Sequence, residues 1–316
     1  MTPVVETNKL SKWYGKIAGV NDLTVKIGAG VTGLLGPNGA GKSTAIKLLS
    51  GALRPSKGEL KVFGEPVWGN LETLRRIGHC PEHDGIYHDL TAVEFVAAMA
   101  TLSGLDKRSA QSAASTALDR VKLGDARNRP IGQYSKGMRQ RVKLAQAIVH
   151  DPDLVLFDEP LTGCDPVARA QIVALIKALG KEGKAVLVSS HILHEIEAMT
   201  DQIVLLYKGQ VLADGNIYRI REMIDEHPHK VSVRCEHPRQ LAAAIVEQSA
   251  ISAVHFPDDQ ELLIETRMPD QCYGLLASAI VEGGFSVAAL TSPDNNLQSV
   301  FEYLTRNRGP EGVADA

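Results

Sequence analysis

The 316-residue sequence predicts an α/β fold, in which a sheet domain carries an antiparallel β lobe and a helical lobe and is followed by a smaller α+β module. Short apolar segments at residues 154–157, 185–188 and 203–207 alternate with helical patterns, which is typical of a parallel sheet covered on both faces. Helical spacing also dominates residues 84–150. After residue 228 the order becomes strand, helix, strand, strand, helix, strand, which is typical of a ferredoxin-like module.

The first domain is predicted to begin with strands. Residues 4–35 favour β structure, because residues 23–27 alternate apolar and polar side chains and residues 31–35 form a short, mostly apolar strand. A helix is predicted at residues 42–53, where apolar side chains recur at helical spacing. Residues 54–58 combine Arg, Pro, Ser, Lys and Gly, and this composition predicts a turn.

The helical lobe is expected at about residues 84–150 of a first domain that spans residues 4–225. Thr91 and Glu94 form the pattern of a capping box at its first helix. In such a box the threonine hydroxyl accepts a hydrogen bond from a free amide of the first turn, while the glutamate reaches back to the cap. The first helix of the lobe is therefore expected to begin at Thr91.

A change of pattern near residues 226–229 predicts a domain boundary. It separates the first domain from an α+β module at residues 228–306, which ends in a helix at residues 297–305 and is followed by a tail at residues 307–316. From residue 228 onward the chain has six Lys and Arg residues and twelve Asp and Glu residues, so the module is acidic. Two strand-like segments inside it are each followed by a proline, which suits the first turn of a helix.

Charge and hydropathy exclude several classes of function. The net charge is -3, without the basic excess that nucleic-acid binding usually requires. No apolar stretch approaches the ~18 residues that span a bilayer, and residues 1–8 lack a signal pattern. The four cysteines lie far apart and predict thiols rather than a disulfide framework. We therefore expect a cytoplasmic chain whose membrane role, if it has one, depends on a partner.

The segment after residues 31–35 matches the pattern G-x-x-x-x-G-K-[ST] and opens the predicted helix. Glycines in this pattern let backbone amides converge on a phosphate, and the start of the helix adds positive potential. Lys42 is expected to reach the β- and γ-phosphates, and Ser43 to bind Mg²⁺. The motif predicts a P-loop NTPase sheet with a nucleotide held by Gly36, Asn38, Gly39, Gly41, Lys42, Ser43 and Thr44.

Two carboxylates, Asp158 and Glu159, follow the apolar strand at residues 154–157. Ligands of open α/β sheets bind at the carboxyl ends of the strands. Asp158 is expected to hold Mg²⁺, directly or through water, and Glu159 to polarise the attacking water. Two acids after a strand are also common on protein surfaces, so this expectation depends on the phosphate loop upstream.

The order of these motifs resembles the ATP-binding cassette (ABC) ATPases over roughly residues 4–225. The order is the phosphate loop, Tyr134-Ser135-Lys136-Gly137-Met138, Asp158-Glu159 and then His191. The resemblance implies an ATPase that uses ATP and Mg²⁺ and in which two copies of the chain enclose two ATP molecules. The Pro81-Glu82 loop, the form of the second motif and the acidic module resemble the type-2 exporter branch.

The resemblance also implies roles for residues that bind ATP. Tyr14 lies where the family has an aromatic side chain that stacks on adenine, with Trp13 as the nearest alternative. Ser135 and Gly137 resemble the signature motif, which contacts the γ-phosphate of ATP held by the other protomer. Asp165 lies in a loop that crosses the dimer interface in the family, and it also suits the start of a helix.

Two further residues carry roles that the resemblance implies for catalysis. His191 matches the switch histidine that contacts the γ-phosphate. Glu82 stands where the family usually has glutamine, near Mg²⁺, the attacking water and the membrane partner. The sequence departs from the family pattern again at Lys136 and Met138, where glycine and glutamine are commoner, and at Cys164, where leucine is usual.

The loop around Glu82 contains a group of candidate metal ligands. They are His79, Cys80, His83, Asp84 and His88. Imidazole, thiolate and carboxylate groups are common metal ligands, but the spacing of these residues matches no closed zinc pattern. The sequence leaves open whether this loop binds a metal ion.

The leading interpretation is the ATP-binding and ATP-hydrolysing subunit of an ABC-type membrane exporter. It would form a homodimer, drive a separate integral membrane permease, lie at the inner face of the cell membrane and bind no nucleic acid. The alternative is a soluble ABC-family ATPase in translation or DNA repair, although translation factors carry two cassettes and repair members a long coiled coil. A third class is a regulatory nucleotide-binding module, which the intact Lys42, Glu159 and His191 argue against. The transported substrate and the role of the acidic module stay open.

Overall fold

The computed structural model of the protein describes residues 3–83, 85–218, 220 and 229–292. The chain divides into two compact units, Met1–Ile217 and Tyr218–Ala316. The predicted boundary lies mostly outside the described residues, because residues 226–228 are not among them. The predicted helix at residues 297–305 and the predicted tail also lie outside the described residues.

A six-stranded sheet forms the centre of the first unit, in the order β11-β10-β4-β9-β8-β7. Its strands are β4 (Gly30–Leu35), β7 (Ile77–Cys80), β8 (Leu154–Phe157), β9 (Ala185–Ser190), β10 (Gln202–Tyr207) and β11 (Gln210–Asn216). The five strands from β10 to β7 are parallel, and β11 runs antiparallel to β10 at one edge. The predicted parallel sheet and its three apolar strands are confirmed, with β9 extending through Ser190.

A second sheet, the antiparallel β lobe, follows the order β2-β1-β5-β6, and β3 also pairs with β1. Its strands are β1 (Val5–Tyr14), β2 (Ile17–Leu23), β3 (Lys26–Ile27), β5 (Lys57–Val62) and β6 (Glu65–Pro66). The predicted alternation at residues 23–27 is present, since Leu23, Val25 and Ile27 are buried. These residues are nevertheless divided between β2 and β3.

Two predicted boundaries in this region are wrong. The helix predicted at residues 42–53 is α1 (Lys42–Leu49), and it ends early because Gly51 adopts a left-handed φ of 72°. The predicted turn at residues 54–58 is shorter, because Lys57 already pairs with Ser11 of β1 as β5 begins. In both places pairing or backbone conformation, rather than composition, determines where the element ends.

The helical lobe consists of three helices, α3 (Ala92–Leu102), α4 (Lys107–Arg120) and α5 (Lys136–Ile148). The expected capping box is present: the Glu94 amide donates to Thr91 Oγ1 at 3.3 Å, and the Thr91 amide donates to Glu94 Oε2 at 2.9 Å. A Cβ atom on Gly78 of β7 would lie 1.9 Å from the carbonyl oxygen of Ala147. Glycine at that position therefore lets α5 pack closely against the sheet.

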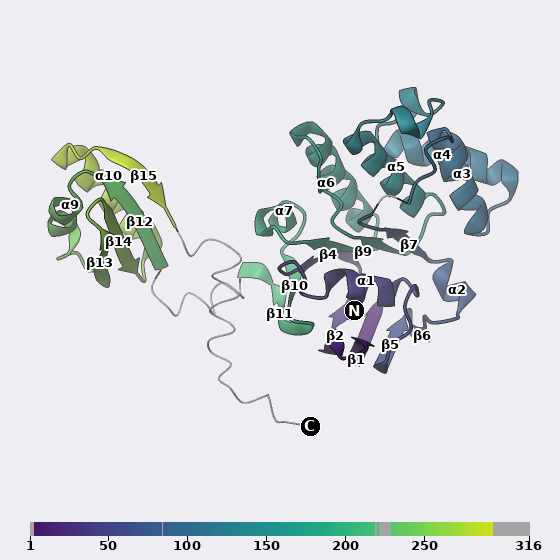
Figure 1. Cartoon of the computed structure of the whole chain (residues 1–316), viewed down its shortest axis with the longest axis horizontal. Coiled ribbons are helices and arrows are strands. Elements are labelled where there is room, and N and C mark those ends of the chain that lie inside the picture. The colour runs from purple at the N-terminus through teal and green to yellow at the C-terminus, as the bar shows by residue number, and fades with distance from the viewer. Residues whose placement is uncertain (1–2, 84, 219, 221–228, 293–316) are drawn as a thin grey trace. The chain divides into compact units, whose positions relative to one another are not determined.

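Further α-helices of the first unit are α2 (Leu71–Leu74), α6 (Pro166–Lys181) and α7 (Leu193–Glu197). In Figure 1, α6 and the helical lobe lie on one side of the parallel sheet, while α1 lies between that sheet and the antiparallel lobe. Ile46, Leu48 and Leu49 of α1 are buried in the same apolar cluster as Leu34, Leu156 and Val204 of the sheet. Within the described residues, no helix combines the length and apolar character needed to cross a bilayer.

The second unit contains a four-stranded antiparallel sheet in the order β13-β14-β12-β15. Its elements are β12 (His229–Cys235), α9 (Pro238–Ile245), β13 (Ala253–Asp258), β14 (Glu261–Thr266), α10 (Pro269–Gly283) and β15 (Val287–Thr291). The predicted element order and ferredoxin-like topology are confirmed. Each predicted proline lies in the first turn of its helix. Side chains such as Val233, Ile264 and Leu276 form a separate apolar core.

Candidate active site

The predicted catalytic side chains follow three neighbouring parallel strands and lie at one edge of the sheet. The phosphate loop follows β4, Asp158 and Glu159 follow β8, and His191 follows β9, which pairs with both of the other strands. Carboxyl ends of parallel strands share an edge, so the three loops meet there. The sheet order thereby brings together residues that lie more than a hundred positions apart in the sequence.

The phosphate loop depends on glycine for its backbone path. Gly39 has a φ of 79° and Gly41 a φ of 102°, both in the left-handed region. A Cβ atom on Gly41 would lie 2.4 Å from the carbonyl oxygen of Gly19. Gly41 caps α1 without a side-chain hydrogen bond to the first amides of the helix. These residues form a cradle that fits a phosphate group.

The amino group of Lys42 lies inside this cradle. Its Nζ atom donates to the carbonyl oxygens of Gly36 at 2.7 Å and Pro37 at 3.3 Å. The same atom lies 3.4 Å from Glu159 Oε1, and the two side chains are only 6% and 8% exposed. A buried cation therefore faces the loop carbonyls and one carboxylate, in the position from which it would reach nucleotide phosphates.

Glu159 occupies an unusual backbone conformation. Its φ is 48°, in a region that non-glycine residues seldom adopt. Its amide donates to Ser189 Oγ at 2.8 Å, and the Ser189 hydroxyl donates to Asp158 Oδ1 at 2.6 Å. The buried Ser189 hydroxyl therefore binds both the backbone amide of Glu159 and the side chain of Asp158. Ser189 is not among the predicted site residues, although a pair of serines at the end of an otherwise apolar strand is a visible signal.

His191 lies beside the same carboxylate. Its Nδ1 atom is 3.0 Å from Glu159 Oε2, and its ring is 40% exposed. Glu159 therefore contacts Lys42 through one oxygen and His191 through the other. The arrangement places a carboxylate, an amine and an imidazole around one point at the mouth of the phosphate loop.

Oxygen atoms suited to Mg²⁺ lie next to this group. Asp158 is buried, and Ser43, in the first turn of α1, is half-buried. Magnesium is typically held by one or two protein oxygens together with substrate phosphates, so this donor set fits the ion. In the part of the chain that the structure describes, no group of three or more His, Cys, Asp and Glu side chains is arranged to hold a metal ion. Asp84 of the candidate metal loop lies outside the described residues.

Tyr14 lies at the end of β1, next to the phosphate loop. Its side chain is 47% exposed. A Cβ atom on Gly19 would lie 2.8 Å from Tyr14 Cε2 and 3.0 Å from Thr44 Oγ1. The tyrosine ring, Gly19 and Thr44 therefore share one surface, where the ring is open to stacking. Neighbouring Trp13 is 40% exposed, and its amide donates to Ser56 Oγ at 3.1 Å.

The signature-like residues and the Asp165 loop form a second group. Ser135 caps α5 by accepting from the Met138 amide at 3.2 Å, and Asp165 caps α6 by accepting from the Ala168 amide at 2.8 Å. A Cβ atom on Gly137 would lie 3.9 Å from Asp165 Oδ2. The starts of the two helices therefore lie side by side.

Two of the departures from the family pattern, Lys136 and Cys164, lie near this second group. A Cβ atom on Gly163 would lie 2.3 Å from Lys136 Cε, so the lysine stem covers that glycine. Burial raises the pKa of the Cys164 thiol, and Asp165 raises it further. The cysteine is therefore held in its neutral form near the start of α6.

Glu82 follows β7 and is exposed. Its backbone carbonyl accepts from Lys143 Nζ at 2.7 Å, and the Lys143 side chain is almost fully buried. Among the described residues, the Glu82 carboxylate forms no hydrogen bond with Asp158, Glu159 or His191. The structure therefore places Glu82 in the expected loop but does not bring its carboxylate into the group around Glu159.

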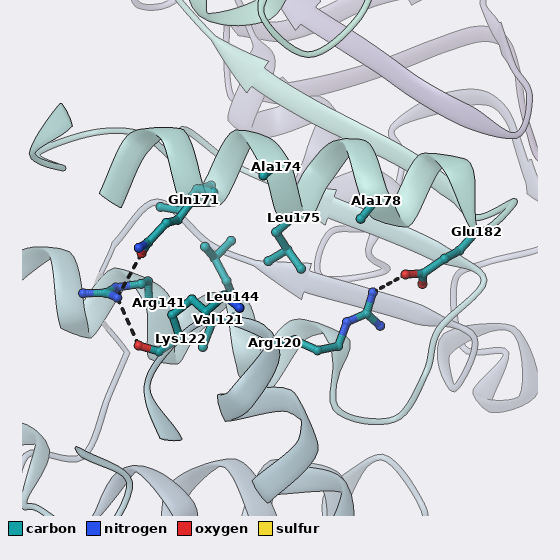
Figure 2. A pocket seen from close by; sticks show the side chains of 11 residues that line it. Arg120, Val121, Lys122, Arg141, Leu144, Gln171, Ala174, Leu175, Ala178 and Glu182 are labelled. Carbon is teal, nitrogen blue, oxygen red and sulfur yellow. Dashed lines mark hydrogen bonds and ion pairs between the residues drawn. The ribbon is translucent and has the colours of Figure 1, made fainter. Parts of the chain in front are cut away.

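A separate cavity of about 300 Å³ lies among the C-terminal end of α4, the middle of α5 and one side of α6 (Figure 2). Its lining includes apolar side chains such as Leu144 and Leu175. It also includes the ion pair of Arg120 with Glu182 and a hydrogen bond from Arg141 to Gln171. None of the predicted site residues lines this cavity.

Comparison with known proteins agrees with this geometry. Residues 20–162 match the family described as ABC transporter. The chain is 33% identical over 307 residues to the daunorubicin/doxorubicin resistance ATP-binding protein DrrA of Streptomyces peucetius, covering 96% of this chain and 93% of that protein. It is 31% identical over 307 residues to the bacitracin transport ATP-binding protein BcrA of Bacillus licheniformis, covering 96% of this chain and 98% of that protein.

A solved structure shares the fold of the first unit. It is the dimeric structure of a post-hydrolysis state of the ATP-binding cassette MJ0796 bound to ADP and Pi, with a TM-score of 0.62 and 24% identity over 67% of this chain and 98% of that chain. The phosphate cradle, the two relatives that match nearly the whole chain and this shared fold all indicate the same protein family. The chain belongs to the ABC transporter family, as an ATP-binding ATPase subunit of the exporter type.

Proposed function

We propose that this chain is a Mg²⁺-dependent ATPase whose hydrolysis drives a separate membrane permease. The observation that carries the proposal is the position of Glu159, which contacts Lys42 through one carboxylate oxygen and His191 through the other. A base for the attacking water, a cation for the phosphates and an imidazole for the γ-phosphate lie within reach of one another. This is the set of groups that phosphoryl transfer to water requires.

Each side chain has a separate task in this proposal. Lys42 exchanges its contact with the loop carbonyls for one with nucleotide phosphates, which releases Glu159 from the ion pair. Glu159 then accepts a hydrogen bond from the attacking water, and His191 orients this carboxylate and the γ-phosphate. Asp158 and Ser43 hold Mg²⁺, which supplies charge neutralisation at the phosphates. Tyr14 stacks on the base, a contact that selects only weakly among nucleotides.

The working unit proposed here is a homodimer. Ser135 and Gly137 lie with Asp165 in a group separate from the one around Glu159, and each chain supplies one group of each kind. Two chains facing each other would complete two composite ATP sites. The dimer reported for the MJ0796 cassette, which shares this fold, supports the same arrangement.

The permease is the second proposed partner. The names of the two relatives describe resistance to daunorubicin and doxorubicin and transport of bacitracin, and both are ATP-binding proteins. By analogy we place this chain at the inner face of the cell membrane, bound to an integral membrane exporter. Exposed Glu82 is the proposed link between nucleotide state and this partner, since its loop also contacts buried Lys143 of the helical lobe.

The test is a comparison of wild-type protein with Lys42→Ala. Purified full-length wild-type protein should release phosphate from ATP in Mg²⁺ buffer and lose that activity in EDTA, and light scattering should detect a dimer that depends on ATP. Lys42→Ala should show neither property. Absence of Mg²⁺-dependent turnover in the wild type would refute the proposal. Copurification of a membrane protein from solubilised membranes would identify the permease.

A further inference from the structure

The loop that carries His191 is held by a buried carboxylate outside the catalytic group. Ser190, the last residue of β9, donates from its hydroxyl to Glu195 Oε2 at 2.7 Å, and the same hydroxyl accepts from the Ile192 amide at 3.1 Å. Each of these hydrogen bonds joins Ser190, which precedes His191, to a residue that follows it. The backbone that presents the imidazole therefore depends on Glu195.

The second oxygen of the Glu195 carboxylate forms an ion pair with a residue of α6. Glu195 Oε1 lies 2.8 Å from Arg169 Nη1, and the Glu195 side chain is only 6% exposed. Arg169 lies in α6, where its amide donates to the carbonyl oxygen of Asp165 at 2.9 Å. One carboxylate thus joins the His191 loop to the start of the helix that Asp165 caps.

The charge of Arg169 is not explained by the stability of its helix. The positive end of the helix dipole lies at the N-terminus, so a cation one turn from the start of α6 is electrostatically disfavoured. The guanidinium instead neutralises a nearly buried carboxylate that has a further task in the His191 loop. An ion pair with one buried member is costly to break from one side, because the remaining charge lacks a partner.

We propose that Arg169 and Glu195 are positioning residues that couple the Asp165 loop to His191. The inference rests on the proposed function, in which Asp165 faces the second protomer and His191 the γ-phosphate. When the second protomer orders the Asp165 loop, Arg169 orders the Glu195 carboxylate, and Ser190 then sets the direction of His191. Turnover thereby depends on the presence of the partner without any contact between Arg169 and ATP.

The test uses Arg169→Met in two backgrounds. In the otherwise wild-type protein, the substitution should lower kcat about three- to tenfold and leave KM for ATP nearly unchanged, in line with typical coupling between linked sites. In a His191→Ala background it should have no further effect on the residual rate, because Arg169 acts only through His191. Arg169→Lys, which keeps the charge, should restore most of the rate.

A second ion pair, at the other end of α6, provides the matched control. Arg120, the last residue of α4, pairs at 2.6 Å with Glu182, the residue that follows α6, beside the cavity of Figure 2. Arg120→Met should leave kcat unchanged. Equal losses from Arg169→Met in both backgrounds, or an unchanged kcat in the first, would overturn the inference. An inactive wild-type protein would instead overturn the proposed function, so the two failures are distinguishable.

Discussion

Lys42 and Glu159 face each other in the interior of the first unit, with Nζ and Oε1 separated by 3.4 Å and both side chains more than nine-tenths buried. The lysine belongs to the phosphate loop after β4, and the glutamate follows β8, two strands away in the sheet. The ion pair occupies the carboxylate that the proposed mechanism assigns to the attacking water. Nucleotide phosphates would compete with Glu159 for the lysine, so binding of the nucleotide and release of the base are linked.

Glu159→Gln should abolish turnover while nucleotide binding persists. The amide cannot act as a base, and losing a general base typically lowers the rate by about 10²–10⁴-fold. ATP would then remain bound, so light scattering should detect an accumulated dimer. The control is Glu182→Gln, the same chemical change at the exposed end of α6. Phosphate release at more than half the wild-type rate would contradict the role of Glu159.

Ser189→Ala should weaken both stability and the response to Mg²⁺. The hydroxyl accepts from the Glu159 amide and donates to Asp158 in a fully buried setting. Its removal leaves a buried amide without a partner, at a cost of about 1–3 kcal/mol. We expect a lower Tm and a higher Mg²⁺ concentration for half-maximal ATPase rate. Ser103→Ala, which removes a hydroxyl bound to a carbonyl in the helical lobe, should change only Tm.

Gly19→Ala should lower affinity for nucleotide. The added Cβ atom would meet the Tyr14 ring at 2.8 Å and the Thr44 side chain at 3.0 Å, so one of them must move. Titration with a fluorescent ATP analogue should show a Kd raised about tenfold, which corresponds to ~1.4 kcal/mol. Gly28→Ala is the matched control, because a Cβ atom there meets nothing within 4 Å. An unchanged Kd for Gly19→Ala would argue against the base lying on this surface.

His150 should make the fold less stable in mild acid. Burial lowers the pKa of its ring below the usual value near 6.5, so the folded state resists protonation that the unfolded chain accepts. The stabilising contribution of the neutral ring is therefore complete above about pH 6.5 and is lost as pH falls below that value. His150→Gln should show a smaller decrease in Tm between about pH 7.5 and 5.5 than the wild type.

Ser103→Ala, which removes no titratable group, supplies the control for this measurement. Its Tm should decrease over this pH range by the same amount as that of the wild type. If His150→Gln and the wild type lose the same Tm over this range, the buried ring is not the group responsible.

Local patterns in the amino-acid sequence are sufficient to predict several elements of this protein. Short runs of residues predict four such features. They are the phosphate loop, the strand at Leu154–Phe157, the capping box at Thr91 and the element order of the second unit. Periodicity of 2 or 3.6 residues and cap chemistry act over a few positions, so they can be recognised without the fold.

The way in which these elements combine into one site depends on contacts between distant segments. The strand order 4-9-8 at the centre of the sheet joins the phosphate loop to Glu159 and His191, and no local pattern encodes that order. Ser189 and Glu195 contact residues of other elements, and Lys57 enters β5 because Ser11 pairs with it. Such long-range contacts depend on which segments the whole core brings into register, which is why the sequence predicts candidate catalytic residues but not the residues that hold them.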